Sequence, residues 1–441
     1  MALDRDELNR RRKEREQQRK KQEAARRRLL FRLGIALLVL LACGVVIFLI
    51  SRGVDRNAEP VMATSDATAP QELPEDTAPP TEPRSALNKG PTVIHVAAAG
   101  DLNITDKVIW SGQTGSEFNY TKAFMDVAPI FSDADLALLN FEGNLCGAPY
   151  GTQTGSAPQQ LMEGLKNAGI DLVQIANSYS IYNGISGLKS TLTNIRAAGI
   201  EPVGAYSTNE EFRRNKGYTI CEVNGIKIAF VAFTKGVGSL GLPAGSENCV
   251  NLLYKDYYTT YKDIDTEAIT AVLKAAASEK PDLTIALLHW GSEYNETIYD
   301  SQEKIVSLLQ KNGVNAIIGS HPHLVQKIDY DEVTGNLVAY SLGDFFGDAK
   351  RGGTSYSIIL DLEITKDYES GTTKITDYSY TPIYTLAEDE CDGSRRVVRI
   401  ENAMSAYELN FVDKVTDSAY ENMKFAMERI PERINPPKDK K

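Results

Sequence analysis

The sequence has 441 residues, 24% of them charged and 42% hydrophobic, which is enough for one large domain with appended segments. Residues 1–32 contain thirteen Lys or Arg and six Asp or Glu, so they carry +7, and the rest of the chain carries −18 to give the net −11. Oppositely charged parts are expected to lie in different surroundings, and the acidic body argues against nucleic acid as a partner.

An uncharged apolar segment, residues 33–50 (LGIALLVLLACGVVIFLI), separates these two parts. Its length reaches the minimum of ~18 residues for a membrane-spanning helix. Four arginines lie within residues 26–32, whereas only Arg52 follows closely. The positive-inside rule therefore predicts a single-pass transmembrane anchor in the cell membrane, with a basic cytoplasmic segment (1–32) and an extracytoplasmic body.

Three other readings of this segment are weaker. The apolar run is longer than the core of an ordinary signal peptide, and no small-residue cleavage site closes it. A lipoprotein box at Cys43 is disfavoured because seven uncharged residues follow it. A buried core helix is disfavoured by the strongly basic flank.

Residues 51–90 are rich in Pro, Thr, Ala and Glu, with PEDTAPPTEP at their centre. A segment of this composition cannot bury enough apolar surface to fold, so we predict a disordered linker that separates the body from the membrane.

The body, predicted over residues 91–400, alternates buried-strand patterns with amphipathic ones. Helices are expected at 156–168, 186–198, 266–278 and 301–312. Strands alternating with helices indicate a wound α/β fold, and Asn224-Gly225 between two apolar runs predicts a β-hairpin. The fold is therefore expected to mix parallel crossovers with hairpins. Residues 401–441 are expected to form one helix and a charged tail.

Four cysteines lie in the body: Cys146, Cys221, Cys249 and Cys391. In an extracytoplasmic domain they allow two disulfides, with three pairings that the sequence does not separate. Cys221 lies in an apolar run and fits a core position equally well. None has the close spacing of a zinc site.

Polar residues follow each predicted strand at its end. In open α/β sheets, ligands bind outside the carboxyl ends of the strands. Imidazole and carboxylate groups gathered there are typical ligands of divalent metals. The residues that we predict to form a metal site together are Asp101, Glu142, His289, His321 and His323.

Other polar residues, each taken alone, are weaker evidence for a site. Each of Asn103, Asn140 and Asn177 fits a helix cap or turn as well as a site. His95 alternates with apolar neighbours, which favours a core or interface histidine. The two histidines of GSHPH, His321 and His323, are stronger evidence for a site, because Pro322 between them stiffens the backbone that sets the spacing of their imidazoles.

Residues 93–346 resemble the CapA family of poly-γ-glutamate capsule proteins (PGA_cap domain), within the calcineurin-like metallophosphatase superfamily. The motifs that carry the resemblance are AAGDLNITD, ALLNFEGNL, LVQIANSYSIYNG, LLHWGSEYN, IIGSHPHLVQ and AYSLGDFF. The resemblance implies a four-layer α/β/β/α sandwich and a divalent metal, Mn, Fe, Zn or Mg, at the five residues named above. It also implies that Trp290 and Glu293 line the pocket. The other residues that we expect to line it are Asn103, Asn140, Asn177, Ser178 and Asp344.

One motif departs from the family pattern. The family reads Asn-Asn-His where this chain has Asn177, Ser178 and Tyr179. Ser178 therefore stands where a metal-binding Asn is expected, and Tyr179 occupies the place of the expected catalytic histidine. That histidine is a general acid, a role that needs a pKa near the working pH, and tyrosine titrates near 10. Asp344 stands where the family commonly has Asn. These changes predict a degenerate centre that keeps its metal and loses efficient hydrolysis.

Three hypotheses follow. The first is an anchored component of poly-γ-glutamate synthesis or export, whose partners are the membrane, synthase or export subunits and the anionic polymer. The second is an active metal-dependent hydrolase of phosphoester or amide bonds in the cell envelope. The third is an envelope domain that has kept the fold and lost both tasks.

Overall fold

The computed structural model describes residues 90–410 and 415–436. The predicted cytoplasmic segment, the transmembrane segment 33–50 and all but the last residue of the predicted linker lie outside the described residues. Within the described ranges, no helix combines the length and the apolar character needed to cross a membrane.

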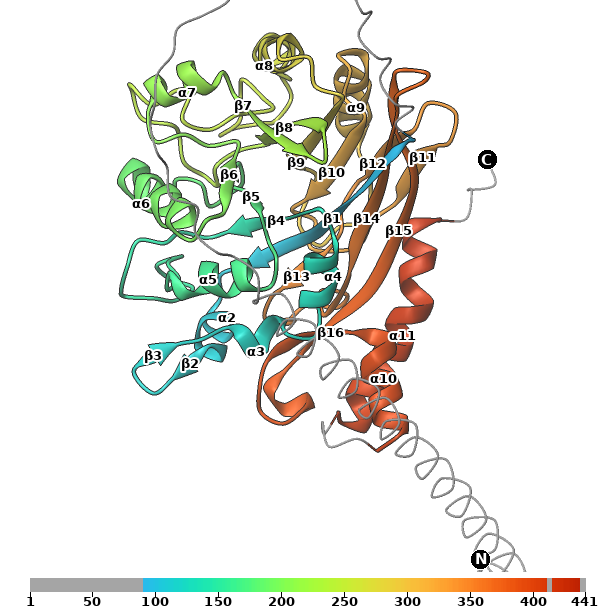
Figure 1. Ribbon diagram of the computed structural model, residues 1–441. Helices are drawn as coiled ribbons and strands as arrows, with labels where there is room; N and C mark the ends of the chain where they lie inside the picture. The colour runs from blue at the N-terminus through green and yellow to red at the C-terminus, as the bar shows by residue number, and fades with distance from the viewer. Residues whose placement is uncertain (1–89, 411–414, 437–441) are drawn as a thin grey trace, which may run out of the picture. The chain divides into compact units, whose positions relative to one another are not determined.

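Two mixed β-sheets form the centre of the described body (Figure 1). The first follows the order β16 (Arg396–Arg399), β15 (Thr372–Leu386), β14 (Tyr356–Asp367), β1 (Thr92–Asn103), β4 (Leu136–Glu142), β5 (Leu172–Gln174) and β6 (Glu201–Val203), with β13 (Asp344–Phe346) paired to β1. The second follows the order β11 (Ile328–Asp331), β12 (Asn336–Ala339), β10 (Ala316–Ser320), β9 (Leu283–His289), β8 (Ile226–Thr234) and β7 (Tyr218–Val223).

Each sheet combines a parallel part with antiparallel strands. In the first sheet β1, β4, β5 and β6 run parallel, and β14, β15 and β16 are antiparallel additions. In the second, β8, β9, β10 and β12 run parallel between the antiparallel edge strands β7 and β11. The predicted hairpin is confirmed, because β7 and β8 meet at Asn224 and Gly225, which have φ of +51° and +79°. The mixed α/β class is likewise confirmed.

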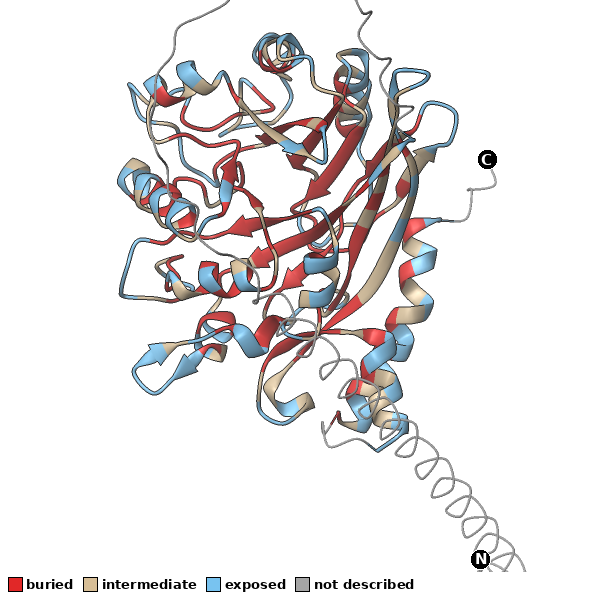
Figure 2. Cartoon of the chain, in the orientation of Figure 1, coloured by how far each residue is buried: buried red, intermediate tan, exposed pale blue. Residues whose placement is uncertain are grey.

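Helices cover the outer faces of the two sheets. The longer ones are α5 (Gln160–Asn167), α6 (Gly184–Ala197), α8 (Thr266–Ser278), α9 (Asp300–Lys311), α10 (Ile400–Glu408) and α11 (Asp417–Ile434). Alternate residues of β8 show the layering. Ile228 and Phe230 join the large core shared with the first sheet, whereas Val231 and Phe233 pack with α8 and α9. Figure 2 shows that the central strands are largely buried and that the outward-facing parts of the helices are exposed. The first sheet is covered by α4 (Ala128–Asp133), α6, α10 and α11.

The helix boundaries follow local chemistry. Helix α8 begins at Thr266, as predicted, because the Asp265 side chain accepts a hydrogen bond from the amide of Ala268 and caps the first turn. The predictions for α6 and α9 are right to within two residues. Helix α5 begins four residues later than predicted, at Gln160. After residue 400 the structure has two helices where one was predicted.

Shorter elements were not predicted at all. They are α2 (Asp106–Ser111), α3 (Thr121–Phe124), α4, α7 (Asn209–Asn215), the 3-10 helix η1 (Glu388–Glu390) and the small hairpin of β2 (Gln113–Thr114) and β3 (Glu117–Phe118). Each is too short to show a periodic apolar pattern in the sequence.

All four cysteines of the body are free thiols, so the structure does not support the two disulfides that the sequence allows. The thiols lie on separate elements with other partners. The Cys146 thiol donates to the carbonyl of Gly187, and the Cys391 thiol to that of Ala387. Cys221 is partly buried against the main core, in line with its apolar neighbours.

Candidate metal centre

Strand register brings the predicted ligands to one edge of each sheet. In the first sheet Asp101 pairs with Asn140, and Asn103 pairs with Glu142, at the carboxyl ends of β1 and β4. In the second sheet His289, the last residue of β9, pairs with Ser320 at the end of β10. The loop after β10 then carries His321 and His323.

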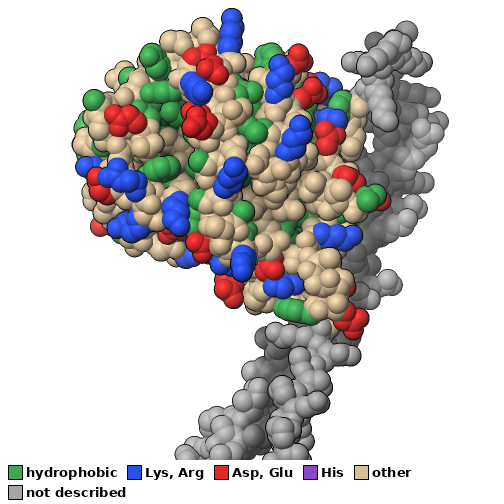
Figure 3. All heavy atoms as spheres, turned by 90° about the horizontal axis from the view of Figure 1, so that it is seen from above, with side chains coloured by type: hydrophobic (Ala, Val, Ile, Leu, Met, Phe, Trp, Pro, Cys, Tyr) green, Lys and Arg blue, Asp and Glu red, His purple; other side chains and the backbone are tan. Residues whose placement is uncertain are grey.

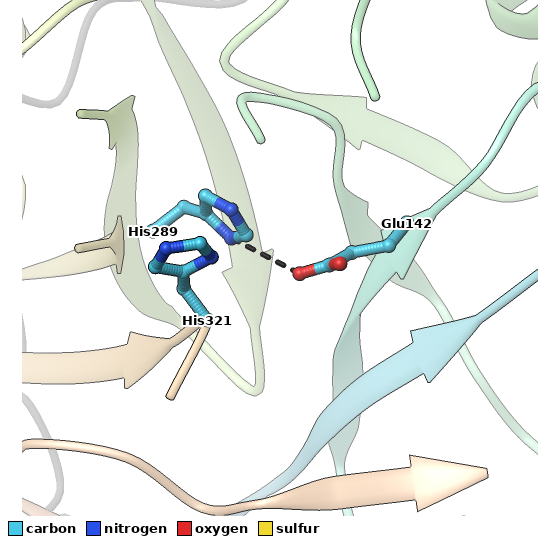
Figure 4. A group of neighbouring side chains, drawn as sticks. All are labelled: Glu142, His289 and His321. Carbon is cyan, nitrogen blue, oxygen red and sulfur yellow. Dashed lines mark ion pairs between the residues drawn. The ribbon is translucent and has the colours of Figure 1, made fainter. Parts of the chain in front are cut away.

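The two sheet edges meet through these residues. The amide of His321 donates to Oδ2 of Asp101 over 3.0 Å, which joins the second sheet to the first. Nδ1 of His289 lies 3.2 Å from Oε1 of Glu142, and the His321 ring lies beside that of His289 (Figure 4). The ring centroids of His289 and His321 are 4.4 Å apart.

All five predicted ligands come together, with two additional carboxylates. Three groups of side chains each have ligand atoms within 4.8 Å of one another: Glu142, His289 and His321; Glu293, His321 and His323; Asp101, His323 and Asp344. Asp344 was expected only to line the pocket, but its Oδ1 lies 2.8 Å from Nδ1 of His323. Apart from the exposed Glu293, these side chains are buried.

The histidine loop has an unusual backbone. His321 and His323 both have positive φ, +92° and +58°, on either side of Pro322. Residues other than glycine rarely adopt this conformation, and each such residue costs of order 1–3 kcal/mol. The surrounding fold therefore holds both imidazoles in place against local strain.

The environment shifts the pKa of every buried group in the cluster. Burial raises the pKa of Asp101 to about 6, and burial together with Asp101 raises that of Glu142 well above its ordinary range. Burial also lowers the pKa of His289 and His321 far below 6.5. Burial acts in the same direction on His323, but the carboxylates of Asp344, Glu142 and Asp101 together outweigh it and raise the pKa well above 6.5.

The cluster fits a divalent cation. Nδ1 of His321 is buried without a hydrogen-bond partner in the described structure. Neutral imidazoles beside carboxylates, one with an unsatisfied nitrogen, form the donor set that Mn, Fe or Zn ions prefer, and the carboxylates alone suit Mg. The fit supports the predicted divalent metal without identifying it.

The three asparagines support the ligands. The Asn140 amide donates to both Asp101 (2.7 Å) and Glu142 (3.0 Å), which holds the two carboxylates at a fixed separation. Asn103 donates to Asp344 over 2.8 Å. Asn177 uses its amide group on Asn140 and on a backbone carbonyl, and its side-chain oxygen accepts from the amide of Tyr179. Asn177 is therefore a structural brace rather than a free ligand.

The departure from the family motif has a clear structural consequence. Oγ of Ser178 lies 3.0 Å from Nε2 of His289, so the serine hydroxyl directly contacts a predicted ligand. The Tyr179 ring packs against Tyr182, with centroids 5.4 Å apart. Burial raises the pKa of Tyr179 to about 12, and Glu142 and Glu293 act in the same direction.

The prediction that Trp290 lines the pocket is wrong, and of the two alternatives for His95, core or interface, the core position is excluded. Trp290 does not line the pocket: it is fully buried, stacks on Tyr340 and donates its indole N–H to the Tyr340 carbonyl over 2.9 Å. Trp290 follows the last residue of β9, and its side chain turns back into the core. His95 is not a core residue, because 44% of its side chain is exposed. It is satisfied by Asp361, 2.9 Å away, which raises its pKa.

Two neighbours of the cluster were missed from the sequence. Lys235 follows β8, which pairs in parallel with β9 so that Thr234 lies opposite His289. Lys235 is a polar residue directly after the end of β8, so the pattern that indicated the predicted ligands could also have located this lysine. Tyr294 stacks on His323 with ring centroids 5.2 Å apart, and the Arg351 guanidinium carbon lies over the tyrosine ring, 4.4 Å from its centroid. No pattern in the sequence indicates this stack.

An open cleft of about 360 Å³ borders the cluster. It is lined by Ser178, Lys235, Gly236, Gly238, Tyr261, Ser292, Glu293 and His321. Burial lowers the pKa of Lys235, and Glu293 opposes this effect.

Together these features define an α/β domain with a candidate divalent-metal centre where two sheets meet. Residues 95–349 match the sequence model of the family described as bacterial capsule synthesis protein PGA_cap. Because this match covers more than half of the chain, the protein belongs to that family.

Two relatives with known names are similar over part of their length. The PGA biosynthesis protein CapA of Bacillus subtilis (strain 168) is 26% identical over 283 residues, which are 62% of this chain and 69% of the relative. The capsule biosynthesis protein CapA of Bacillus anthracis is 28% identical over 209 residues, 47% of this chain and 48% of the relative. The second match thus spans about half of that protein.

Solved structures give weaker similarity. The calcineurin-like phosphoesterase YfkN from Bacillus subtilis is 15% identical, with a TM-score of 0.42 over 78% of this chain and 98% of that one. A hypothetical protein from Thermus thermophilus is 15% identical, with a TM-score of 0.39 over 66% of this chain and 98% of that one. Family membership therefore rests on the sequence matches.

Proposed function

We propose that this protein is a membrane-anchored, extracytoplasmic component of poly-γ-glutamate capsule synthesis or export. In this proposal a divalent-metal centre of the metallophosphatase type binds anionic groups of the polymer or its precursor, with little or no hydrolysis. Membership of the PGA_cap family and the names of the two Bacillus relatives support the capsule role.

One observation carries the choice of binding over catalysis. The five predicted ligands lie together, but the position of the family's general acid holds Tyr179, whose pKa is raised to about 12. A general acid works best with a pKa near the working pH, and a positioned acid contributes roughly 10²- to 10⁴-fold in rate. A tyrosine that titrates far above neutral pH is a poor replacement.

A bound cation would also resolve an electrostatic conflict. The chain outside residues 1–32 carries −18, which repels a polyanion. On the face of the described body in Figure 3, basic and acidic side chains are interspersed, without an extended basic patch. A metal ion is the largest local charge in such a site, so it would attract carboxylate groups that the rest of the surface repels.

Each part of the site has a defined task in this proposal. The cation would be held by the carboxylates and imidazoles, and would supply Lewis acidity toward an anionic oxygen. Asn140 keeps Asp101 and Glu142 at their separation. Tyr294 restrains the ring of His323.

The first test is elemental analysis of the purified full-length chain, together with a phosphodiester assay in added manganese. Near-stoichiometric metal without turnover supports the proposal. Metal with rapid turnover would favour the active hydrolase of phosphoester or amide bonds instead. A chain that retains no metal would contradict the binding centre.

The second test restores the family motif. Ser178→Asn combined with Tyr179→His is expected to raise phosphodiester turnover by about 10²-fold or more, because it supplies a titratable acid. Tyr182→His is the matched control, since Tyr182 packs against Tyr179 but lies outside the Asn-Asn-His positions. Equal turnover in the double variant and the control would show that more than the acid was lost.

Anchoring is tested separately by cell fractionation. The full chain is expected in the membrane fraction, and a chain lacking residues 33–50 in a soluble fraction. Recovery of both in the same fraction would contradict the anchor.

A further inference from the structure

Lys235 lies directly beside the metal ligands although it is far from them in sequence. Its backbone amide donates to the carbonyl of His289 over 2.8 Å, at the edge where β8 and β9 end together. This contact fixes the position of Lys235 relative to a predicted ligand. The lysine is only partly exposed, so its place in the site is set by the fold.

The Lys235 ammonium has no acidic partner within 4 Å among the residues that the structure describes. It donates to the carbonyl of Gly291 over 2.7 Å and lies 4.8 Å from the centroid of the Tyr261 ring. A lysine ammonium has three N–H donors, and this carbonyl accepts only one. Two donors therefore remain for a ligand.

The ammonium and the metal cluster line the same cleft. Lys235, Ser178 and His321 all line the cleft of about 360 Å³, and His321 belongs to two of the three ligand groups. Ligand pockets range over roughly 300–1,000 Å³, so this cleft admits one small group rather than several polymer units. The acidic Glu293 also lines it and disfavours additional negative charge.

We propose that Lys235 and the metal centre together bind a single anionic group, carboxylate or phosphate, of a ligand that enters this cleft. The inference rests on the proposed function, because the metal supplies one side of the anion's contacts. It adds that the ligand is recognised at one charged group at a time, such as a chain end or one repeating unit.

The test is isothermal titration of inorganic phosphate and, separately, glutarate into the manganese-loaded full-length chain. Lys235→Met is expected to weaken the preferred probe by about 10- to 100-fold, the range for loss of one charged hydrogen bond, without changing metal content. Lys235→Arg should retain part of the affinity because it keeps the charge. The probe that binds more tightly identifies the chemistry of the anion.

The matched control is Lys227→Met, a partly exposed lysine at the other end of β8 whose ammonium contacts Glu279. Its affinity for both probes is expected to equal that of the wild type. Unchanged affinity in metal-loaded Lys235→Met, or no binding of either probe to the metal-loaded wild type, would overturn the inference.

The outcome also separates this inference from the proposed function. If the wild-type chain holds no metal, the proposed function fails, and the titrations are repeated on the metal-free protein. Lys235→Met must then still weaken phosphate or glutarate binding relative to Lys227→Met. An equal affinity in those two variants would refute a role for Lys235 as well.

Discussion

Replacing Asp101 with asparagine should remove a defined part of the pH dependence of stability that the metal-free cluster creates. The folded state raises the pKa of this carboxyl from 3.8 to about 6, chiefly by burial. A raised acid pKa means that the native state binds the proton more tightly than the unfolded state does. Stability is therefore greatest below the unfolded pKa and falls as the pH rises through the folded pKa.

The magnitude follows from the size of that shift. One pKa unit corresponds to about 1.4 kcal/mol, so a change from 3.8 to about 6 corresponds to about 3 kcal/mol. The wild-type chain should lose roughly this amount of unfolding free energy between pH 4 and pH 7 through Asp101 alone. Asp101→Asn, which has no proton to exchange, should flatten this part of the profile. Its absolute stability will also change, because the carboxylate accepts hydrogen bonds from Asn140 and His321.

The measurement is urea denaturation of the full-length chain in a chelator, at several pH values from 4 to 7. Asp133→Asn serves as the control, since Asp133 is exposed. Added manganese should reverse the wild-type trend, because a metal ligand must be deprotonated and metal binding then strengthens with pH. Parallel profiles for Asp101→Asn and wild type in the chelator would refute the reasoning.

Three other predictions concern single parts of the site. His321→Ala with His323→Ala should reduce bound manganese at least 10-fold by elemental analysis, whereas His95→Ala, outside the cluster, should retain it. Trp290→Ala should cost about 3–5 kcal/mol of unfolding free energy in urea, the range for a buried aromatic, and a cost near zero would contradict its core position. Tyr294→Ala should weaken manganese binding several-fold with little change in melting temperature, because the 40%-exposed ring restrains His323 and fills little of the core. Unchanged affinity would show that His323 needs no such restraint.

The strand ends were the most informative part of the sequence. Polar residues that close apolar runs had to meet at the carboxyl edges of the sheets, so Asp101, Glu142 and His289 were found from pattern and topology alone. Their role as metal ligands stays a prediction. The contact between the sheets, such as His321 to Asp101, depends on tertiary packing that no local pattern encodes.

The failures have physical reasons of the same kind. Trp290 follows a predicted ligand, but its side chain points to the opposite side of the chain, where an apolar pocket and the Tyr340 carbonyl accept it. Lys235 was overlooked because its strand was read only as half of a hairpin. Its significance comes from the parallel pairing of β8 with β9, which joins residues more than fifty positions apart.

The energetics of the cluster bear on why the chain carries it. Burial opposes the charged form of Asp101, Glu142, His289 and His321 alike, and the backbone at His321 is strained as well. A protein that only needed to fold would be more stable with apolar residues at these positions. A ligand at 100 times its Kd contributes about 2.7 kcal/mol to stability, which is close to the Asp101 cost alone. The unfavourable burial is therefore partly offset when a cation occupies the cluster, and this supports the proposed binding site.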